Sequence, residues 1–302
     1  MPPESTYHGR KTQAAGSTTP GFRPDFFVVG AAKAATTSLC DLISSHRDVF
    51  FCPEKEPNFF TANYDRGHDW YESLFATSRT ALARGEGSTT YSQIGVWPHT
   101  VERLARSSPE ARIVYIVREP LVRMQSHWIQ WRVEGKIAPG SFSKAVFEVP
   151  GLLDASLYWK QVSAYREHFP DERILVLFFE DFTARPEAVV RRVLAFLGLD
   201  REVPLASGLA ANNPSSSHRS PLWSGRMLQK IPGYARVRRL PMWLRKPFSP
   251  FLSTPFSEQP LWEEPARAWA LEKIAPDAKQ FLAFYGKPEE YWPAVLRPGD
   301  TS

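Results

Sequence analysis

The stretch Asp25-Phe-Phe-Val-Val-Gly-Ala-Ala-Lys-Ala-Ala-Thr-Thr-Ser-Leu-Cys40 decides how the chain folds. It begins with an apolar run at 26–29, which is typical of a buried strand, and continues through small residues around Lys33. From 39 to 45 the apolar residues recur at helical spacing. A strand, a small-residue loop and a helix that opens on hydroxyls are typical of a phosphate-binding turn, because such a turn presents unpaired N–H groups.

The position of Lys33 separates this loop from the loop of the nucleoside triphosphatases. Their motif places lysine directly before Ser or Thr, in Gly-x4-Gly-Lys-Ser/Thr. Here Lys33 precedes Thr36 by three positions, and alanines stand where the second glycine would be. Taken alone, the stretch also fits an ordinary βα turn with a solvated lysine.

The composition indicates a folded protein with an excess of positive charge. The chain has 302 residues, 43% of them hydrophobic, and suits one large domain or two small ones. The net charge of +5 favours an anionic ligand, although nucleic acid or a membrane surface would fit the same bias. Two cysteines form no disulfide framework, no apolar run has the length of a membrane span, and the N-terminus lacks a signal-peptide pattern. We therefore expect a soluble, cytoplasmic protein.

Further βα units follow the first. Apolar runs predict strands at 49–52, 112–118 and 173–179, and apolar spacing predicts helices at 121–131, 152–169, 186–197 and 263–285. This alternation predicts an α/β fold of three layers, with a central, mostly parallel sheet, a P-loop-like phosphate-binding βα turn and helices on both faces. We predict a single domain at 25–302, preceded by a disordered tail at 1–24 that is rich in Ser, Thr, Gly and Pro.

Two more loops are expected at the carboxyl edge of the sheet, where open α/β sheets bind ligands. If the strand at 49–52 pairs beside the first strand, its loop brings Glu56 close to Lys33. Otherwise Glu56 is an ordinary solvated charge. The segment Gly85–Ser92 has the composition of another loop at this edge, and a plain turn is the alternative.

The strand at 112–118 ends on Arg118, and the helix after it carries Ser126. A guanidinium at that position can hold a phosphate in bidentate fashion, and the serine hydroxyl can contact the same anion. The alternative is that Arg118 simply pairs with a carboxylate.

The segment 203–257 differs from the rest of the chain, because it contains no aspartate or glutamate and is rich in Arg, Pro and Trp. We interpret the part around Arg219 and Ser220 as a flap that closes over an anion. Residues 230–256 line an acceptor pocket, contact a membrane peripherally or form a solvated basic face, and the sequence does not rank these three.

With these pieces assembled, the chain resembles the sulfotransferases that use 3′-phosphoadenosine-5′-phosphosulfate (PAPS). It is most similar to the branch that holds the heparan sulfate glucosaminyl sulfotransferases and their bacterial relatives. The resemblance lies in four stretches, Phe27–Leu39, Glu54–Phe60, Gly85–Tyr91 and Val114–Ser126. Their order and spacing are more specific than any one of them.

The resemblance implies transfer of a sulfuryl group from PAPS to an acceptor hydroxyl or amine, with 3′,5′-ADP as product and no metal. It gives catalytic roles to Lys33, at the leaving oxygen, and to Glu56, as the base. The residues that it implies around the donor are Lys33, Ala34, Ala35, Thr36, Thr37 and Ser38 at the 5′-phosphosulfate, Arg118 and Ser126 at the 3′-phosphate, and Arg219 and Ser220 on the flap.

Three residues depart from the family pattern, and the last of them bears on the acceptor. Ala34-Ala35 stand where Gly-Gly or Ser-Gly is usual, and Asn58 stands where histidine is common. Gly87 replaces a residue that is often lysine in the glycan-modifying members, which weakens the argument for a heparan-like acceptor. The acceptor is a small molecule, a lipid or a glycan, and the sequence identifies neither it nor the oligomeric state.

Two other functions compete with this interpretation. A small-molecule kinase that uses ATP and magnesium is suggested by the apolar strand that ends in Glu180-Asp181, but the position of Lys33 argues against it. A non-enzymatic protein that binds membrane or nucleic acid through 230–246 leaves the loops at Lys33 and Arg118 unexplained, so no nucleic-acid partner is expected. As the base, His99 and His218 are the rivals of Glu56.

Overall fold

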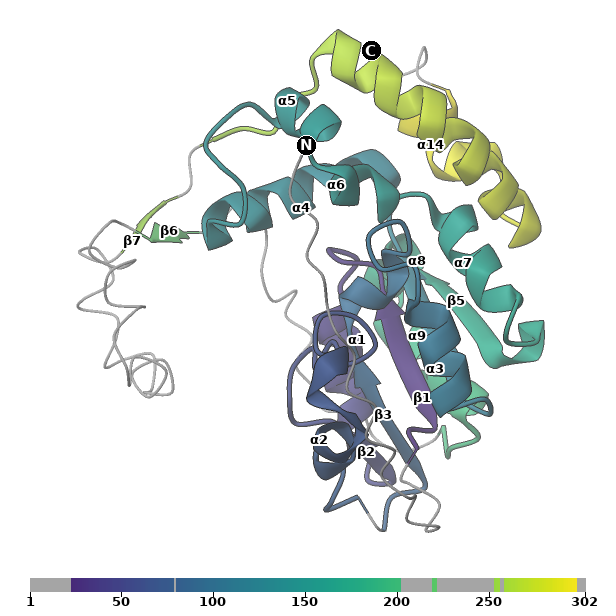
Figure 1. Ribbon diagram of the computed structural model, residues 1–302. Coiled ribbons are helices and arrows are strands. Elements are labelled where there is room, and N and C mark those ends of the chain that lie inside the picture. Colours follow the sequence, from purple (N-terminus) through teal and green to yellow (C-terminus); the bar gives the residue numbers. More distant parts are fainter. Residues whose placement is uncertain (1–22, 79, 202–218, 222–252, 256–257, 298–302) are drawn as a thin grey trace.

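The computed structural model describes residues 23–78, 80–201, 219–221, 253–255 and 258–297. Its main sheet has five parallel strands in the order β2-β3-β1-β4-β5 (Figure 1). The strands are β1 (Phe26–Gly30), β2 (Val49–Phe51), β3 (Ala83–Gly87), β4 (Arg112–Val117) and β5 (Ile174–Phe178). β1 and β5 are buried along their whole length, which is why they are continuous apolar runs in the sequence.

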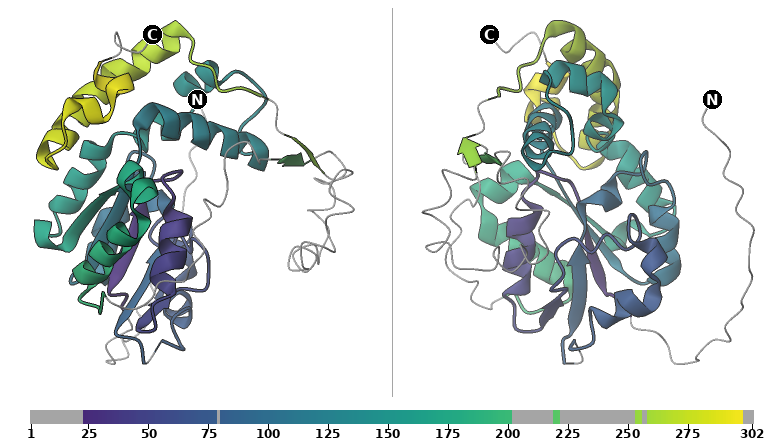
Figure 2. Two further views of the ribbon diagram at one scale, coloured as in Figure 1. Left: turned by 180° about the vertical axis from the view of Figure 1, so that it is seen from behind. Right: turned by 60° about the vertical axis from the view of Figure 1, so that its left-hand side comes forward.

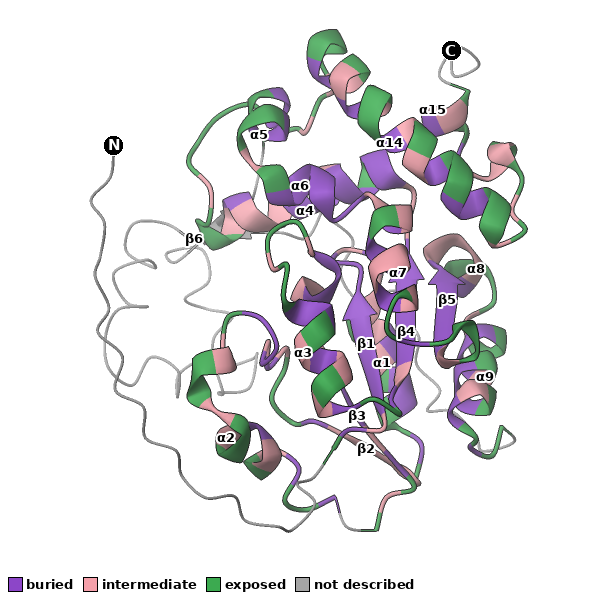
Figure 3. Cartoon of the chain, turned by 45° about the vertical axis from the view of Figure 1, so that its right-hand side comes forward, coloured by how far each residue is buried: buried purple, intermediate pink, exposed green. Residues whose placement is uncertain are grey.

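Helices cover both faces of this sheet, so the predicted three-layer α/β fold is confirmed (Figures 1 and 3). α1 (Thr36–Ser44) and α9 (Pro186–Leu197) contact each other on one face, and α3 (Thr100–Ser107) and α7 (Tyr158–Arg166) lie on the other. The remaining α-helices are α2 (His68–Ser73), α4 (Pro120–Glu134), α5 (Phe142–Glu148), α6 (Pro150–Asp154), α8 (Phe179–Ala184), α14 (Glu264–Phe284) and α15 (Pro293–Leu296). Short 3₁₀ helices occur at Tyr64–Arg66, Thr89–Ser92 (η2), Asp171–Arg173 and Glu289–Tyr291.

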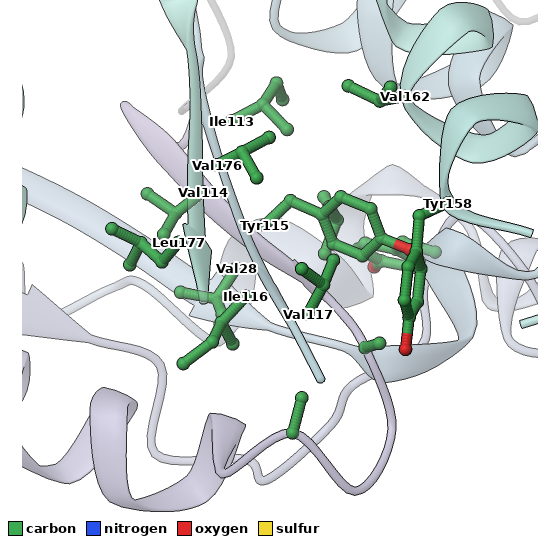
Figure 4. Close-up of a cluster of buried hydrophobic side chains, with 14 of the residues drawn as sticks. Val28, Ile113, Val114, Tyr115, Ile116, Val117, Tyr158, Val162, Val176 and Leu177 are labelled. Carbon is green, nitrogen blue, oxygen red and sulfur yellow. The ribbon is translucent and has the colours of Figure 1, made fainter. Parts of the chain in front are cut away.

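The core is densest around β4. Figure 4 shows Tyr115 pointing toward Tyr158 of α7, while Val114 and Ile116 point to the opposite side of the strand. The rings of Tyr115 and Tyr158 lie 6.0 Å apart, edge to face. Since successive side chains of a strand point to opposite faces, this one strand contributes to both halves of the core.

Strand β3 corrects one prediction and decides one pairing. The sequence predicts a loop at Gly85–Ser92, but the first three of these residues belong to β3. The strand at 49–52 does not pair beside the first strand, because β3 lies between β1 and β2. The sequence of β3, Ala-Arg-Gly-Glu-Gly, has neither an apolar run nor strand-forming residues. Gly85 is required there because the Phe26 ring occupies the space of a Cβ, 2.5 Å from that position. The loops after β1, β2 and β3 still share one edge, because all the strands are parallel.

The helix predicted at 152–169 is two helices, α6 and α7. The break is stabilised from a distant part of the chain, since the Asp277 carboxylate accepts hydrogen bonds from the N–H groups of Trp159 (3.0 Å) and Lys160 (2.9 Å). These N–H groups belong to the first turn of α7, where no intrahelical partner exists. A cap supplied by α14 leaves no mark in the local sequence.

α4 and α14 cross over the carboxyl edge of the sheet (Figure 2). Beside α4, β6 (Arg219–Pro221) pairs antiparallel with β7 (Ser253–Pro255). The rest of the basic segment at 203–257 and residues 1–22 of the predicted tail lie outside the described residues. None of the helices described is long and apolar enough to span a bilayer.

Candidate active site

A cleft of about 870 Å³ opens at the carboxyl edge of the sheet; we call it the donor cleft. Its lining brings together residues from all four of the stretches singled out in the sequence. Those among the predicted site residues are Lys33, Ala35, Thr36, Thr37, Ser38, Glu56, Arg118 and Ser126. Ala34 is fully buried beneath the loop and does not line the cleft. For Arg219 and Ser220, in β6, the structure describes the backbone alone.

The loop after β1 reverses direction through two left-handed residues, Lys33 (φ 72°) and Ala35 (φ 64°). α1 then begins at Thr36, and no side chain caps its first turn. Thr36, Thr37 and Ser38 of that turn line the donor cleft, so the unpaired N–H groups of the helix start and the positive end of its dipole lie at the cleft. This geometry suits an anion, as the sequence predicts.

Replacing Ala35 with glycine is expected to raise the free energy of unfolding by up to about 1 kcal/mol in urea denaturation. A left-handed alanine is strained by roughly 1–2 kcal/mol, part of which is offset by the greater entropy of glycine in the unfolded chain. Ala34→Gly is the matched control, because Ala34 is buried and is not among the left-handed residues. That variant should lose about 1–2 kcal/mol. If Ala35→Gly and Ala34→Gly lower the free energy of unfolding equally, Ala35 is not strained.

The Lys33 and Arg118 cations both line the donor cleft, and neither forms an ion pair with a carboxylate of the described residues. Arg118 Nη1 donates to the Lys33 carbonyl oxygen (3.3 Å), and the guanidinium lies over the Phe179 ring, 4.4 Å from its centroid. No described carboxylate forms an ion pair with either side chain, so the alternative of a simple Arg118–carboxylate pair is not what this part of the chain adopts. Burial lowers the pKa of Lys33. An anion in the cleft would compensate this desolvation.

Arg123, which is not among the predicted site residues, holds the loop after β1 in place by hydrogen bonds. Its fully buried guanidinium donates to the carbonyl oxygen of Ala32 (3.4 Å) and to Ser156 Oγ (2.7 Å). It also contacts His127 Nδ1 (3.0 Å), and burial together with this cation holds the pKa of His127 well below its usual range. The neutral His127 lines the cleft beside Ser126. The spacing of Arg123 and His127, one helical turn apart, is the signal that could have found them.

The loop after β2 holds Glu56 in the cleft through two more left-handed residues, Glu56 (φ 50°) and Asn58 (φ 49°). Asn58 fixes this shape. Its side chain donates to the Glu56 carbonyl oxygen (2.8 Å) and accepts from Thr90 (2.7 Å), while its N–H donates to Ser88 Oγ (3.0 Å). Burial raises the pKa of Glu56, although nearby Lys55 and a hydrogen bond with Thr89 oppose this. A carboxylate with a raised pKa is suited to accept a proton.

Below Asn58 lies a buried carboxylate, Glu86 on β3, which the sequence analysis also does not single out. Three hydroxyls donate to it, from Tyr71 (3.1 Å), Tyr91 (2.6 Å) and Ser88 (2.7 Å). Burial raises its pKa to about 7, even though the three hydrogen bonds favour the charged form. A hydrogen-bonded chain thus runs from Glu86 through Ser88 and Asn58 to the Glu56 loop.

Glu86→Gln is expected to flatten the pH dependence of stability. The pKa of Glu86 is about 7 in the folded state and 4.5 in its unperturbed state, so between these values the folded protein holds the extra proton. Stability therefore falls as pH rises through this window, by roughly 3 kcal/mol from this one group. Denaturation at pH 5 and pH 8 measures the effect, with the exposed Glu172→Gln as control. If the unfolding free energy of Glu86→Gln changes with pH as steeply as that of the wild type, the raised pKa of Glu86 is contradicted.

Of the two rival bases, only His99 lies among the described residues. His99 is exposed at the start of α3 and does not line the donor cleft, and His218 lies outside the described residues. Asp181, the candidate magnesium ligand of the kinase alternative, is already engaged by Lys287 Nζ (2.7 Å) and the Tyr291 hydroxyl (2.9 Å).

A parallel α/β sheet whose carboxyl edge carries an uncapped helix N-terminus and two cations that no described carboxylate pairs with defines a protein that binds a phosphorylated ligand. More particularly, the chain belongs to the sulfotransferase family, because residues 23–216 match the model of the sulfotransferase domain. The predicted resemblance is confirmed.

Individual proteins similar to the chain are sulfotransferases as well. The chain is 28% identical over 187 residues to heparan sulfate glucosamine 3-O-sulfotransferase 3B1 of Mus musculus, a match that covers 59% of this chain and 47% of that protein. With 3-O-sulfotransferase 6 of Mus musculus it shares 28% identity over 211 residues, 67% of this chain and 60% of the relative. The chain thus spans about half the length of these relatives.

A sulfotransferase from Alicyclobacillus acidocaldarius has the same fold. Its crystal structure superposes with a TM-score of 0.64 at 24% identity, covering 90% of this chain and 99% of that one.

Proposed function

We propose that this protein transfers a sulfuryl group from PAPS to the hydroxyl or amine of an acceptor and releases 3′,5′-ADP. The observation that carries the proposal is that two cations, Lys33 and Arg118, line one cleft without an ion-pair partner among the described carboxylates. The Arg118 guanidinium is held beside the loop by its hydrogen bond to the Lys33 carbonyl oxygen. Membership of the sulfotransferase family supports the same chemistry. The acceptors of the relatives are not carried over, since the chain spans only part of their length.

The lining of the donor cleft fits such a nucleotide. Its volume of about 870 Å³ lies in the range of small-molecule sites. Lys33 and the first turn of α1 would hold the 5′-phosphosulfate, and Arg118 with Ser126 would hold the 3′-phosphate. Trp131 and Phe179, which the sequence does not predict as site residues, line the same cleft. Their aromatic rings would pack against the adenine ring of the nucleotide. Arg219 and Ser220 remain the proposed flap.

Two side chains would carry the chemistry. When bound, PAPS supplies the sulfuryl group, whose bond to the 5′-phosphate oxygen breaks as the acceptor oxygen bonds to sulfur. The Lys33 ammonium stabilises the charge left on that phosphate oxygen, and the Glu56 carboxylate takes the proton of the acceptor hydroxyl. Asn58 positions Glu56, because the Asn58 side chain donates a hydrogen bond to the Glu56 backbone carbonyl oxygen.

Titration calorimetry tests the proposal. We expect 3′,5′-ADP to bind without added metal, and to bind more tightly than ATP with magnesium. Labelled PAPS then reports transfer in an acceptor screen. Tighter binding of ATP with magnesium, and none of 3′,5′-ADP, would instead support the kinase alternative, although the engaged carboxylate of Asp181 argues against it.

A further inference from the structure

A second cavity, of about 300 Å³, lies beside the donor cleft. It is bounded by one face of α1, by the end of β2 and by Gly87 at the end of β3. Both cavities are lined by Thr36, Thr37, Lys55, Glu56 and Thr89. The second cavity therefore meets the donor cleft at the candidate base.

Part of the wall of the second cavity is apolar, and Cys40, Phe51, Cys52 and Pro53 form it. Burial raises the pKa of Cys52 to about 12 and moves the pKa of Cys40 upward as well, so both thiols are neutral. A neutral, partly buried cysteine behaves as a small hydrophobic side chain.

The charges that line the second cavity do not suit an anionic acceptor. Among the described residues, Lys55 is its one cation, set against Asp41 and Glu56. In the donor cleft the balance is the opposite, because the described cations Lys33, Lys55, Arg118 and Lys136 face only Glu56 and Glu134. Of the two cavities, the donor cleft is thus the one whose described lining carries more cations than carboxylates.

Gly87 keeps the second cavity open. A Cβ at this position would lie 2.9 Å from Cys40 Sγ and 3.4 Å from the Phe51 ring. Any side chain here must therefore displace Cys40 or enter the cavity. A long or charged side chain here would extend into the space that Cys40 and Phe51 line.

We propose that the second cavity takes the apolar body of an uncharged alcohol or phenol, with its hydroxyl at Glu56. This rests on the proposed function, of which it names the acceptor class. A volume of about 300 Å³ holds about ten non-hydrogen atoms at the roughly 30 Å³ that a water-sized group occupies in a liquid. The acceptor is thus the size of a six- to eight-carbon alcohol or a substituted phenol.

A series of acceptors tests this. With labelled PAPS, kcat/KM is expected to rise about fourfold per methylene from ethanol through 1-butanol to 1-hexanol, on the order of 10²-fold in all. 1-Hexanol should also be a better acceptor than an N-sulfated heparan oligosaccharide, because that polyanion meets two carboxylates and one ammonium at the cavity.

Two variants and one control test whether the second cavity causes the rise of kcat/KM with alcohol length. Gly87→Val fills the second cavity and is expected to remove the gain from ethanol to 1-hexanol without changing the affinity for 3′,5′-ADP. Gly140→Val is the matched control, since nothing lies within 4 Å of a Cβ there, and it should behave as the wild type. Cys40→Ala enlarges the cavity and shifts the best acceptor to a longer alcohol, so the test survives a failure of Gly87→Val to fold.

The outcomes separate the two proposals. If 3′,5′-ADP does not bind, the proposed function fails and this inference falls with it. If 3′,5′-ADP binds but kcat/KM does not rise with alcohol length, or the sulfated oligosaccharide is the better acceptor, the inference is overturned while sulfuryl transfer stands. A rise that persists in Gly87→Val also overturns it.

Discussion

Replacing Glu56 with glutamine is expected to slow sulfuryl transfer by about 10²–10⁴-fold while the affinity for 3′,5′-ADP is unchanged. The amide keeps the shape and the loop contacts of the side chain but cannot accept a proton from the acceptor hydroxyl. Steady-state kcat with labelled PAPS and calorimetry with 3′,5′-ADP measure the two quantities separately.

The pH profile sharpens this test. Because burial raises the pKa of Glu56, the wild-type rate should fall as pH drops through that raised pKa, where the carboxylate becomes protonated. The acid limb should be absent from the residual activity of Glu56→Gln. Glu54→Gln is the matched control, since Glu54 is exposed on the same loop and lines neither cavity. A normal kcat in Glu56→Gln would remove Glu56 from the mechanism.

Replacing Lys33 or Arg118 with alanine is expected to weaken 3′,5′-ADP binding by at least about 10²-fold, and so to abolish it in calorimetry and to abolish transfer. Removing one partner of a buried, hydrogen-bonded charge pair leaves the other charge desolvated and unpaired. Each cation would face one end of the nucleotide, so each single variant should be severe.

The exposed Lys144→Ala, on α5, is the control for the loss of one positive charge. Circular dichroism and the thermal midpoint should show that both site variants keep the fold, because neither guanidinium nor ammonium is part of the apolar core. Wild-type affinity for 3′,5′-ADP in either variant would separate these cations from nucleotide binding.

The sequence predicts the strands that are buried on both faces, since burial forces them to be apolar throughout. The runs at 26–29, 112–118 and 173–179 become β1, β4 and β5 with ends shifted by a residue or so. It also predicts which loops share the carboxyl edge, because that follows from parallel strands and not from their order. Eight of the predicted site residues consequently line one cleft.

What the sequence does not predict depends on contacts between distant residues. β3 is a strand because Phe26 packs against Gly85 and three hydroxyls surround Glu86, none of which has a local pattern. The left-handed conformations of Lys33 and Ala35 run against residue preference. Such strain is maintained by the surrounding structure and concentrates at functional sites.

The cap that Asp277 of α14 provides for α7 connects a helix near the C-terminus to the nucleotide site. α7 begins with Tyr158, whose hydroxyl donates to the Arg118 carbonyl oxygen (2.6 Å), and whose ring packs on Phe281 of α14 and on Trp292. The family match ends at residue 216, well before these supports. A fragment cut at that boundary would keep the residues that line the donor cleft but lose the proposed flap and the Phe281 and Trp292 rings that support Tyr158 behind Arg118. We therefore expect nucleotide binding to require α14 and Trp292 as well as the matched region.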